Sequence, residues 1–261
     1  MTYSKEPAQD ILAFWNARAG LGQWAGTRDV IAKQLEIEAI AAYVHDGMKI
    51  LDIGCGNGIT AIEIARRYSV DVMGIDFAEE MIAAAKSMAV GQQLRGSVKF
   101  QTGDVRKPSD FSEKFDLIYT ERALINLPDW SAQQQAIIGI TSLLVDGGLY
   151  VMCENSQDGL DEINSLRERS GLPKIIPPWH NRYFRDAELQ TITFPKVKLE
   201  GINYFSSTYY FLSRVVNAWL AAQDGQEPQY EAPVNKLALR LPPLGELGQG
   251  RIWLWRRSSL I

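Results

Sequence analysis

Between residues 49 and 153 the sequence alternates short apolar runs with helical patterns, and this alternation restricts the fold more than any other feature. Buried strands are expected at 49–53, 71–75, 98–101, 115–120 and 149–153. Helices are expected between them, at 59–68, 78–90 and 132–144. Because strands and helices alternate, the strands are expected to be joined by parallel crossovers. The sequence therefore predicts an α/β fold with a doubly wound, mostly parallel sheet.

The segments on either side of this alternation complete the expected architecture. Two further strands are predicted at 196–202 and 251–255, with a helix at 208–222 between them, which makes a seven-stranded sheet. The last strand follows a loop rich in Pro and Gly, so it is expected to pair antiparallel with its neighbour. We expect four segments: an N-terminal helical cap at 1–47, a core at 48–156, a lid insertion at 157–195 and the C-terminal part of the core sheet at 196–261.

Composition excludes several classes of protein. The chain has 261 residues, with 27 Lys plus Arg against 31 Asp plus Glu, so it has no basic excess for nucleic-acid binding. Its two cysteines, Cys55 and Cys153, are too few for a disulfide framework. With only His45 and His180 as histidines, a zinc site is disfavoured and no metal is expected.

The sequence contains no segment that predicts membrane insertion or export. No run approaches the ~18 apolar residues of a membrane span. The first ten residues are polar and mixed in charge, unlike a signal peptide. We therefore expect a cytoplasmic protein that does not bind membranes, and the sequence leaves its oligomeric state open.

The most informative short motif is Leu51-Asp52-Ile53-Gly54-Cys55-Gly56-Asn57-Gly58, which joins the first strand to the first crossover helix. Glycines here let the backbone approach a ligand, and the helix N-terminus offers free N–H groups. A dinucleotide site has the spacing G-x-G-x-x-G, whereas this loop reads G-x-G-x-G. Asp52 would also repel a pyrophosphate and attract an ammonium group.

This motif resembles the first motif of the class I S-adenosylmethionine-dependent methyltransferases, and the resemblance extends over residues 49–155. It implies the Rossmann-like methyltransferase fold and S-adenosylmethionine as the cofactor. It places Asp52, Gly54, Cys55, Gly56 and Gly58 at the cofactor.

The ends of the next three strands carry the later positions of the resemblance. It implies that Asp76 accepts the ribose hydroxyls, that Phe77 packs on the adenine and that Asp104 accepts the adenine amino group. Cofactor contacts are also expected from Gly103, Val105, Thr120, Glu121 and Met81, the last of which also reads as a core residue. In the N-terminal segment, Trp15 and Arg18 are expected to close over the cofactor or the acceptor.

An alcohol or amine acceptor needs a base to remove its proton, and histidine is the usual one near neutral pH. His180 lies in the lid segment, whereas His45 precedes the first strand, so His180 is the candidate catalytic base. Its alternative is a structural loop histidine. Glu154, at the end of the fifth strand, is a second candidate, and it also fits a substrate-binding or buried structural role.

The acceptor pocket is expected to be aromatic with a few polar groups. The candidate substrate-binding residues are Arg122, Asn155, Trp179, Tyr183 and Tyr204. For Arg122 the alternative is a structural ion pair with Glu121 or Glu154. For the tyrosines the alternative is packing in the core. The sequence after the fourth strand, Thr120-Glu121-Arg122-Ala123, lacks the N/D-P-P-Y/F signature of amino-directed nucleic-acid methyltransferases.

These residues predict a methyltransferase that acts on a small polar molecule, by O-methylation of a sugar or secondary metabolite. N-methylation or carboxyl methylation of a small molecule is the alternative. Two readings from other classes remain: a non-catalytic cofactor-binding partner subunit, and an NAD-type oxidoreductase, which the glycine spacing disfavours.

Overall fold

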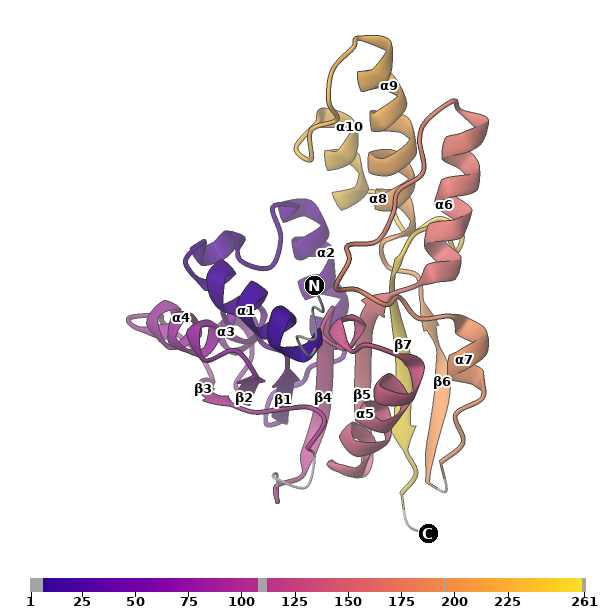
Figure 1. The fold of residues 1–261 in the computed structure, drawn as a ribbon. Helices are drawn as coiled ribbons and strands as arrows, with labels where there is room; N and C mark the ends of the chain where they lie inside the picture. Colours follow the sequence, from indigo (N-terminus) through magenta and orange to yellow (C-terminus); the bar gives the residue numbers. More distant parts are fainter. Residues whose placement is uncertain (1–6, 108–111, 195, 260–261) are drawn as a thin grey trace, which may run out of the picture.

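The computed structural model describes residues 7–107, 112–194 and 196–259. A single seven-stranded sheet crosses it in the order β3-β2-β1-β4-β5-β7-β6. All neighbouring strands are parallel except that β7 runs antiparallel to both β5 and β6. This confirms the predicted doubly wound sheet with an antiparallel last strand, and Figure 1 shows the strands side by side.

The strands follow the apolar runs of the sequence. Their bounds are Lys49–Ile53 (β1), Asp71–Asp76 (β2), Ser97–Thr102 (β3), Phe115–Glu121 (β4), Leu144–Asn155 (β5), Val197–Asn203 (β6) and Gly250–Arg257 (β7). The longer helices are Pro7–Ala19 (α1), Val30–Ala41 (α2), Ile59–Arg67 (α3), Glu79–Ala89 (α4), Trp130–Ser142 (α5) and Gln157–Arg169 (α6). The shorter ones are Asp186–Gln190 (α7), Ser207–Phe211 (α8), Asn217–Gln223 (α9) and Pro233–Lys236 (α10), with 3-10 turns at Gly22–Trp24 (η1), Leu124–Asn126 (η3) and Leu237–Leu239 (η5).

Both faces of the sheet are buried, which explains why its strands read as nearly continuous apolar runs. Along β5, Tyr150 and Met152 join a core with α5, α6 and α7, whereas Val151 and Cys153 join a core with α2, α3 and α4. Alternate residues of a strand point to opposite faces, so each helical layer packs against its own set of side chains.

Two elements differ from the sequence prediction. Strand β5 begins at Leu144 instead of Leu149, because the Asp146-Gly147-Gly148 segment, predicted as a turn, forms an irregularity within the strand. The helix predicted at 208–222 is α8 and α9 joined by a π-helical turn, Leu212–Val216 (η4). A π turn inserts a residue into the helical repeat, often at functional sites.

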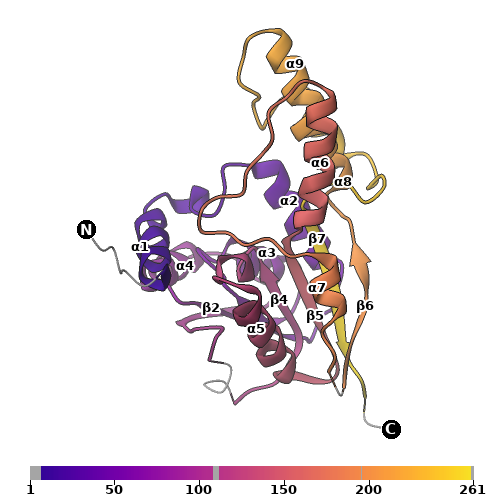
Figure 2. The same cartoon turned by 45° about the vertical axis from the view of Figure 1, so that its right-hand side comes forward.

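The helices between β6 and β7 rise beyond one end of the sheet, next to α6 (Figures 1 and 2). They share a small core with α6 and α2, which contains Ile31, Ile163, Tyr209 and Val215. On the other side, α1 packs against α4 through Trp15, Met81 and their neighbours. These raised helices lie within segment 196–261, which the sequence predicts as the C-terminal part of the core sheet.

Candidate functional site

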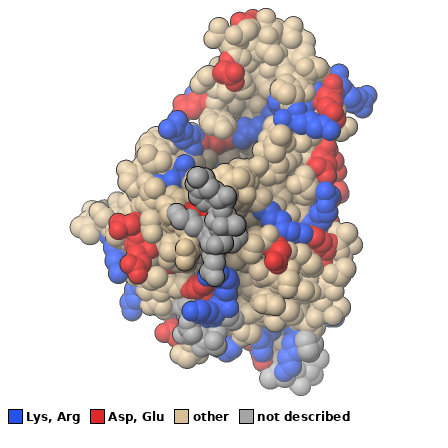
Figure 3. Space-filling model, viewed as in Figure 1, with Lys and Arg blue, Asp and Glu red and all other residues tan. Residues whose placement is uncertain are grey.

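A cavity of about 670 Å³ lies at the carboxyl ends of the central strands. Its walls come from α1, α2, the glycine loop after β1, four residues of the lid segment (Pro178, His180, Asn181 and Tyr183) and the raised helices. In parallel α/β sheets, ligands bind at this end of the strands. Figure 3 shows the surface hollowed beneath the raised helices, with charged atoms of both signs around the hollow.

The glycine loop presents its backbone to this cavity. Gly54 has a φ of +74°, and a Cβ on it would lie 2.4 Å from the Ala123 Cβ, so only glycine fits there. Gly56 has a φ of +52°, and a Cβ on it would meet nothing within 4 Å. There is no room for a side chain at Gly54, whereas open space lies beside Gly56. A ligand can therefore approach the loop backbone closely at Gly56.

Asp52 is buried at the cavity wall, with 2% of its surface exposed. Burial raises the pKa of its carboxyl to about 8, against a lowering effect of the neighbouring Tyr119 hydroxyl. Its Oδ2 atom has no hydrogen-bond partner within the described part of the chain. A buried carboxylate oxygen without a partner is the group that a bound cation would stabilise.

The next two strand ends complete this side of the cavity. Asp76 accepts hydrogen bonds from the backbone N–H groups of Gly56 and Ala78, both at 2.9 Å, which fix its carboxylate beside the glycine loop. Asp104 is held by the Arg106 guanidinium at 2.6 Å. Both aspartates line the cavity, so the polar positions of three successive strands converge on one space.

The structure brings most of the predicted site residues together. The cavity wall includes Trp15, Arg18, Asp52, Gly54, Cys55, Gly56, Asp76, Phe77, Met81, Gly103, Asp104, Val105, Glu121, Arg122, Asn155, His180 and Tyr183. It does not include Gly58, Thr120, Glu154, Trp179 and Tyr204.

These five residues have other surroundings. A Cβ on Gly58 would lie 2.6 Å from Phe100, and the Thr120 hydroxyl is hydrogen-bonded to the Tyr150 hydroxyl at 3.0 Å. Trp179 is 68% exposed, and the Tyr204 ring stacks on the Arg251 guanidinium, 4.8 Å away. The structure therefore favours packing roles for Gly58 and Thr120.

Glu154 is buried away from the cavity and binds backbone instead. Its carboxylate accepts hydrogen bonds from the N–H groups of Ala123 at 3.1 Å, Leu124 at 3.0 Å and Ile125 at 3.3 Å. Burial raises its pKa to about 7, and these hydrogen bonds act in the opposite direction. Of the roles that the sequence left open, this geometry favours the structural one, in which Glu154 holds η3 at the cavity edge.

Replacing Glu154 by alanine is expected to lower the free energy of unfolding by ~2 kcal/mol, because it leaves buried N–H groups without an acceptor. Urea unfolding measures this change. The matched control is Glu168→Ala, an exposed glutamate in a surface ion pair, which is expected to change stability by less than ~1 kcal/mol. Wild-type stability of Glu154→Ala combined with lost turnover would instead place Glu154 on the acceptor.

His180 projects into the cavity from the lid segment. Its ring stacks on Phe14 at 4.4 Å and contacts the edge of Trp15 at 5.9 Å, so α1 fixes its position. Burial and the neighbouring Arg18 lower its pKa below 6.5. Its Nδ1 atom has no hydrogen-bond partner among the residues that the structure describes. His180 is therefore neutral at pH 7.

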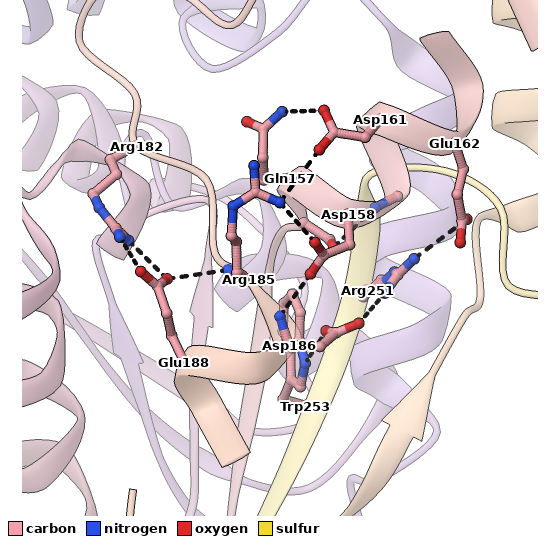
Figure 4. A network of polar contacts seen from close by, with 12 residues as sticks. Gln157, Asp158, Asp161, Glu162, Arg182, Arg185, Asp186, Glu188, Arg251 and Trp253 are labelled. Atoms are coloured by element: carbon pink, nitrogen blue, oxygen red, sulfur yellow. Dashed lines mark hydrogen bonds and ion pairs between the residues drawn. The ribbon is translucent and has the colours of Figure 1, made fainter. Parts of the chain in front are cut away.

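The lid segment is tied to the core on the C-terminal side of His180. The Gln133 amide of α5 donates to the backbone oxygens of Leu124 at 3.1 Å and Arg182 at 2.9 Å, so it links η3 to the lid. Figure 4 shows the polar network farther along, in which Asp186 accepts hydrogen bonds from Arg251 at 2.6 Å and from the Trp253 indole at 3.0 Å. These bonds anchor the lid to β7.

Sequence reasoning missed the charged residues that α2 contributes. Glu121 pairs with Lys33 at 2.5 Å, and Glu36 lies 3.1 Å from Arg122. Burial raises the pKa of Glu36 to about 8, whereas at Glu121 the effect of burial is outweighed by Lys33, and its pKa falls to about 2. Asp29, Lys33 and Glu36 are spaced by four and three residues, so a polar stripe along this helix was the available signal.

The raised helices supply a second missed group. The Arg214 guanidinium of η4 binds the Asp29 carboxylate at 2.8 Å and stacks on the Tyr230 ring at 5.1 Å. The Tyr209 hydroxyl donates to the same carboxylate at 2.5 Å.

The backbone of Arg122, which follows β4, has an uncommon conformation. Its φ is +52°, a value that residues with a side chain rarely adopt and that is found at strained functional sites.

Two other features are absent from the part of the chain that the structure describes. Within residues 7–107, 112–194 and 196–259, no group of three or more His, Cys, Asp or Glu side chains is placed to hold a metal ion. In the same ranges no helix has the length and apolar character needed to cross a membrane.

Comparison with known proteins identifies relatives that span part of the chain. Phosphoethanolamine N-methyltransferase 3 of Arabidopsis thaliana is 37% identical over 83 residues, which are 32% of this chain and 16% of that protein. Ubiquinone biosynthesis O-methyltransferase of Coxiella burnetii is 31% identical over 102 residues, which are 39% of this chain and 41% of that protein. The matches thus span less than half the length of these curated relatives.

The fold itself is shared over a longer range. The structure of magnesium protoporphyrin IX methyltransferase from Synechocystis PCC 6803 with bound S-adenosylmethionine superposes with a TM-score of 0.58. It is 14% identical, and the match covers 99% of this chain and all of that one. The profile of the family described as "Methyltransferase domain" matches residues 44–183. The chain therefore belongs to the methyltransferase-domain family, as its likeness to the class I S-adenosylmethionine-dependent methyltransferases predicted.

Proposed function

We propose that the chain binds S-adenosylmethionine in this cavity and transfers its methyl group to an oxygen atom of a small polar acceptor, a sugar or a secondary metabolite. The observation that carries this proposal is that His180 and the loop with Asp52 and Gly56 line the same cavity. A candidate base and a candidate cofactor cradle therefore share one space.

The residues present fit the cofactor. When bound, S-adenosylmethionine supplies a methyl group on a positively charged sulfur, which becomes a neutral thioether as the acceptor oxygen takes the methyl. The buried carboxyl of Asp52 suits the ammonium group, and that of Asp76 suits the ribose hydroxyls. The open face of Gly56 leaves room for the ligand beside the backbone.

The residues of the chain then have two tasks in the reaction. The cavity walls align the acceptor and exclude water, and such positioning can supply ~7–11 kcal/mol of the barrier. His180 accepts the proton that the acceptor hydroxyl loses as its oxygen gains the methyl group. Its lowered pKa keeps the imidazole neutral at pH 7, so it is ready to accept this proton.

N-methylation is the second candidate, because one relative with 37% identity is a phosphoethanolamine N-methyltransferase. Both candidates release S-adenosylhomocysteine, so this product alone does not separate them. A screen with metabolites, sugars and amines does, because it identifies the class of the acceptor. The protein is incubated with S-adenosylmethionine and each compound, and S-adenosylhomocysteine is measured. Product formation with hydroxyl compounds supports the proposal, whereas turnover of amines alone contradicts it.

A further inference from the structure

Two arginine side chains, Arg122 and Arg214, line the cavity from distant parts of the chain. Arg122 follows β4, whereas Arg214 lies in η4 among the raised helices. The side chain of Arg122 is 25% exposed and that of Arg214 is 19% exposed, so part of each stays accessible. Burial raises the pKa of the Tyr183 hydroxyl, and the positive charges of both arginines lower it. Because such an effect needs proximity, the two guanidinium groups lie near Tyr183 on the same side of the cavity.

The guanidinium group of Arg214 is held in one position. The Asp29 carboxylate binds it at 2.8 Å. Three aromatic rings surround it, with their centres 5.8 Å (Tyr209), 5.3 Å (Tyr210) and 5.1 Å (Tyr230) away. A guanidinium group has more N–H donors than one carboxylate takes up. A ligand that binds the remaining donors therefore meets a group whose orientation is already fixed.

Arg122 is bound more weakly by its neighbours. Its Nε atom lies 3.1 Å from the Glu36 carboxyl, but without the geometry of a hydrogen bond. Its Nη2 atom lies 3.8 Å from Glu121, which is too far for a hydrogen bond. The two oxygens of Glu121 are bound by Lys33 at 2.5 Å and by the Thr60 hydroxyl at 2.6 Å. Glu121 is therefore the partner of Lys33 more than of Arg122.

The charges on this wall do not balance at pH 7. Lys33 and Arg214 each bind an ionised carboxylate. Arg122 has Glu36 as its partner, and burial raises the pKa of Glu36 to about 8 against the lowering effect of Arg122. The Glu36 carboxyl is thus largely protonated at pH 7, which leaves the positive charge of Arg122 without an ionised partner. Buried charges are normally paired, so an anion in the cavity would stabilise this wall.

The guanidinium group discriminates between the classes of acceptor. Its planar arrangement of N–H donors matches the oxygens of a carboxylate or a phosphate group. A neutral sugar or phenol would leave the charge of Arg122 unpaired, and an ammonium compound would bring a further positive charge to the same wall. The carboxylate of S-adenosylmethionine is the other anion that enters the cavity under the proposed function, so the experiments below separate it from the acceptor.

We propose that the acceptor carries a negatively charged group, a carboxylate or a phosphate, and that Arg122 and Arg214 bind this group while a hydroxyl of the same molecule is methylated. The hydroxyl oxygen gains the methyl group and gives its proton to His180, and the charged group makes and breaks no bond. This inference rests on the proposed function and makes it more specific. It adds Arg214 to the substrate-binding residues and makes charge the basis of acceptor specificity.

The first test compares acceptors that differ in charge, with the wild-type chain. Glucuronic acid and glucose 6-phosphate are each compared with glucose and glucosamine, and 4-hydroxybenzoate is compared with phenol. Formation of S-adenosylhomocysteine is measured for each, and calorimetry measures binding of S-adenosylmethionine alone. Turnover of a carboxylate or phosphate compound, at least ~10-fold above its uncharged counterpart, supports the proposal and identifies the anionic group. Cofactor binding without this preference overturns it, whereas absent cofactor binding defeats the proposed function itself.

The second test uses variants of the two arginines. Arg122→Gln and Arg214→Gln are each expected to raise KM for the anionic acceptor by ~10-fold or more, with an unchanged Kd for S-adenosylmethionine. Arg214→Lys keeps the charge and is expected to stay closer to wild type. Arg240→Gln, at an exposed arginine outside the cavity, is the control.

Two results of the second test would contradict the proposal. Unchanged KM in both glutamine variants would remove the arginines from the acceptor. A weaker affinity for S-adenosylmethionine in Arg122→Gln, with unchanged KM for the acceptor, would place the cofactor carboxylate at Arg122 instead. The comparison of acceptors on the wild-type chain needs no variant, so it decides the question if a substitution prevents folding.

Discussion

Replacing His180 by alanine or glutamine is expected to lower kcat by ~10²–10⁴-fold, the usual contribution of a general base. The His180 imidazole lines the cavity, and its lowered pKa keeps it neutral at pH 7, so it is the candidate to accept the acceptor proton. Glutamine keeps a polar side chain against Phe14, so a loss in both variants separates proton transfer from packing. Steady-state rates of S-adenosylhomocysteine formation measure the effect.

The pH profile adds an independent readout. At saturating S-adenosylmethionine, wild-type turnover is expected to fall as the pH drops below the lowered pKa of His180, and this acidic limb is expected to vanish in the variants. His45→Gln is the matched control, because His45 is exposed and lies outside the cavity. Full turnover in His180→Ala would show that the acceptor needs no base, or that another group removes the proton.

The second large effect is expected at Asp52. Asp52→Asn is isosteric but cannot carry the negative charge that a bound ammonium requires, so we expect the Kd for S-adenosylmethionine to rise by ~100-fold. Isothermal titration calorimetry measures this Kd. Asp224→Asn, an exposed aspartate outside the cavity, is the control and is expected to bind as the wild type does.

Asp52 also gives the wild-type affinity a pH dependence with a definite sign. Burial holds the pKa of the free carboxyl at about 8, so it is largely protonated at pH 6. Binding a cation favours the ionised form, so binding releases a proton, and affinity is expected to rise from pH 6 to pH 8 and then level off. Asp52→Asn should remove this slope. The same slope in both proteins would assign it to another group.

The sheet and the residues at the carboxyl ends of β1, β2 and β3 were predictable because they depend on local patterns. The apolar runs fix the strands from β1 to β4 within one or two residues, and the glycine spacing with Asp52 fixes the loop. Because parallel strands place their carboxyl ends at one edge, Asp76 and Asp104 follow from strand order alone.

The rest of the cavity wall was less predictable because it depends on contacts between distant segments. Nothing near Glu154 in the sequence shows that the η3 backbone captures its carboxylate. The pairing of Asp29 with Arg214 joins residues 185 positions apart. Trp179 and Tyr204, predicted for the acceptor pocket, lie outside the cavity, whereas Asn181 and Gln249 lie within it. Tertiary packing determines which of these residues line the cavity, and a single sequence does not reveal that packing.

Binding of S-adenosylmethionine in the cavity is the central claim, and calorimetric titration of the wild-type chain with S-adenosylmethionine and, separately, with NAD tests it most directly. We predict saturable binding of one S-adenosylmethionine per chain with a Kd below about 1 mM, and no saturable binding of NAD. Saturable binding of NAD, with no binding of S-adenosylmethionine below about 1 mM, would contradict the account.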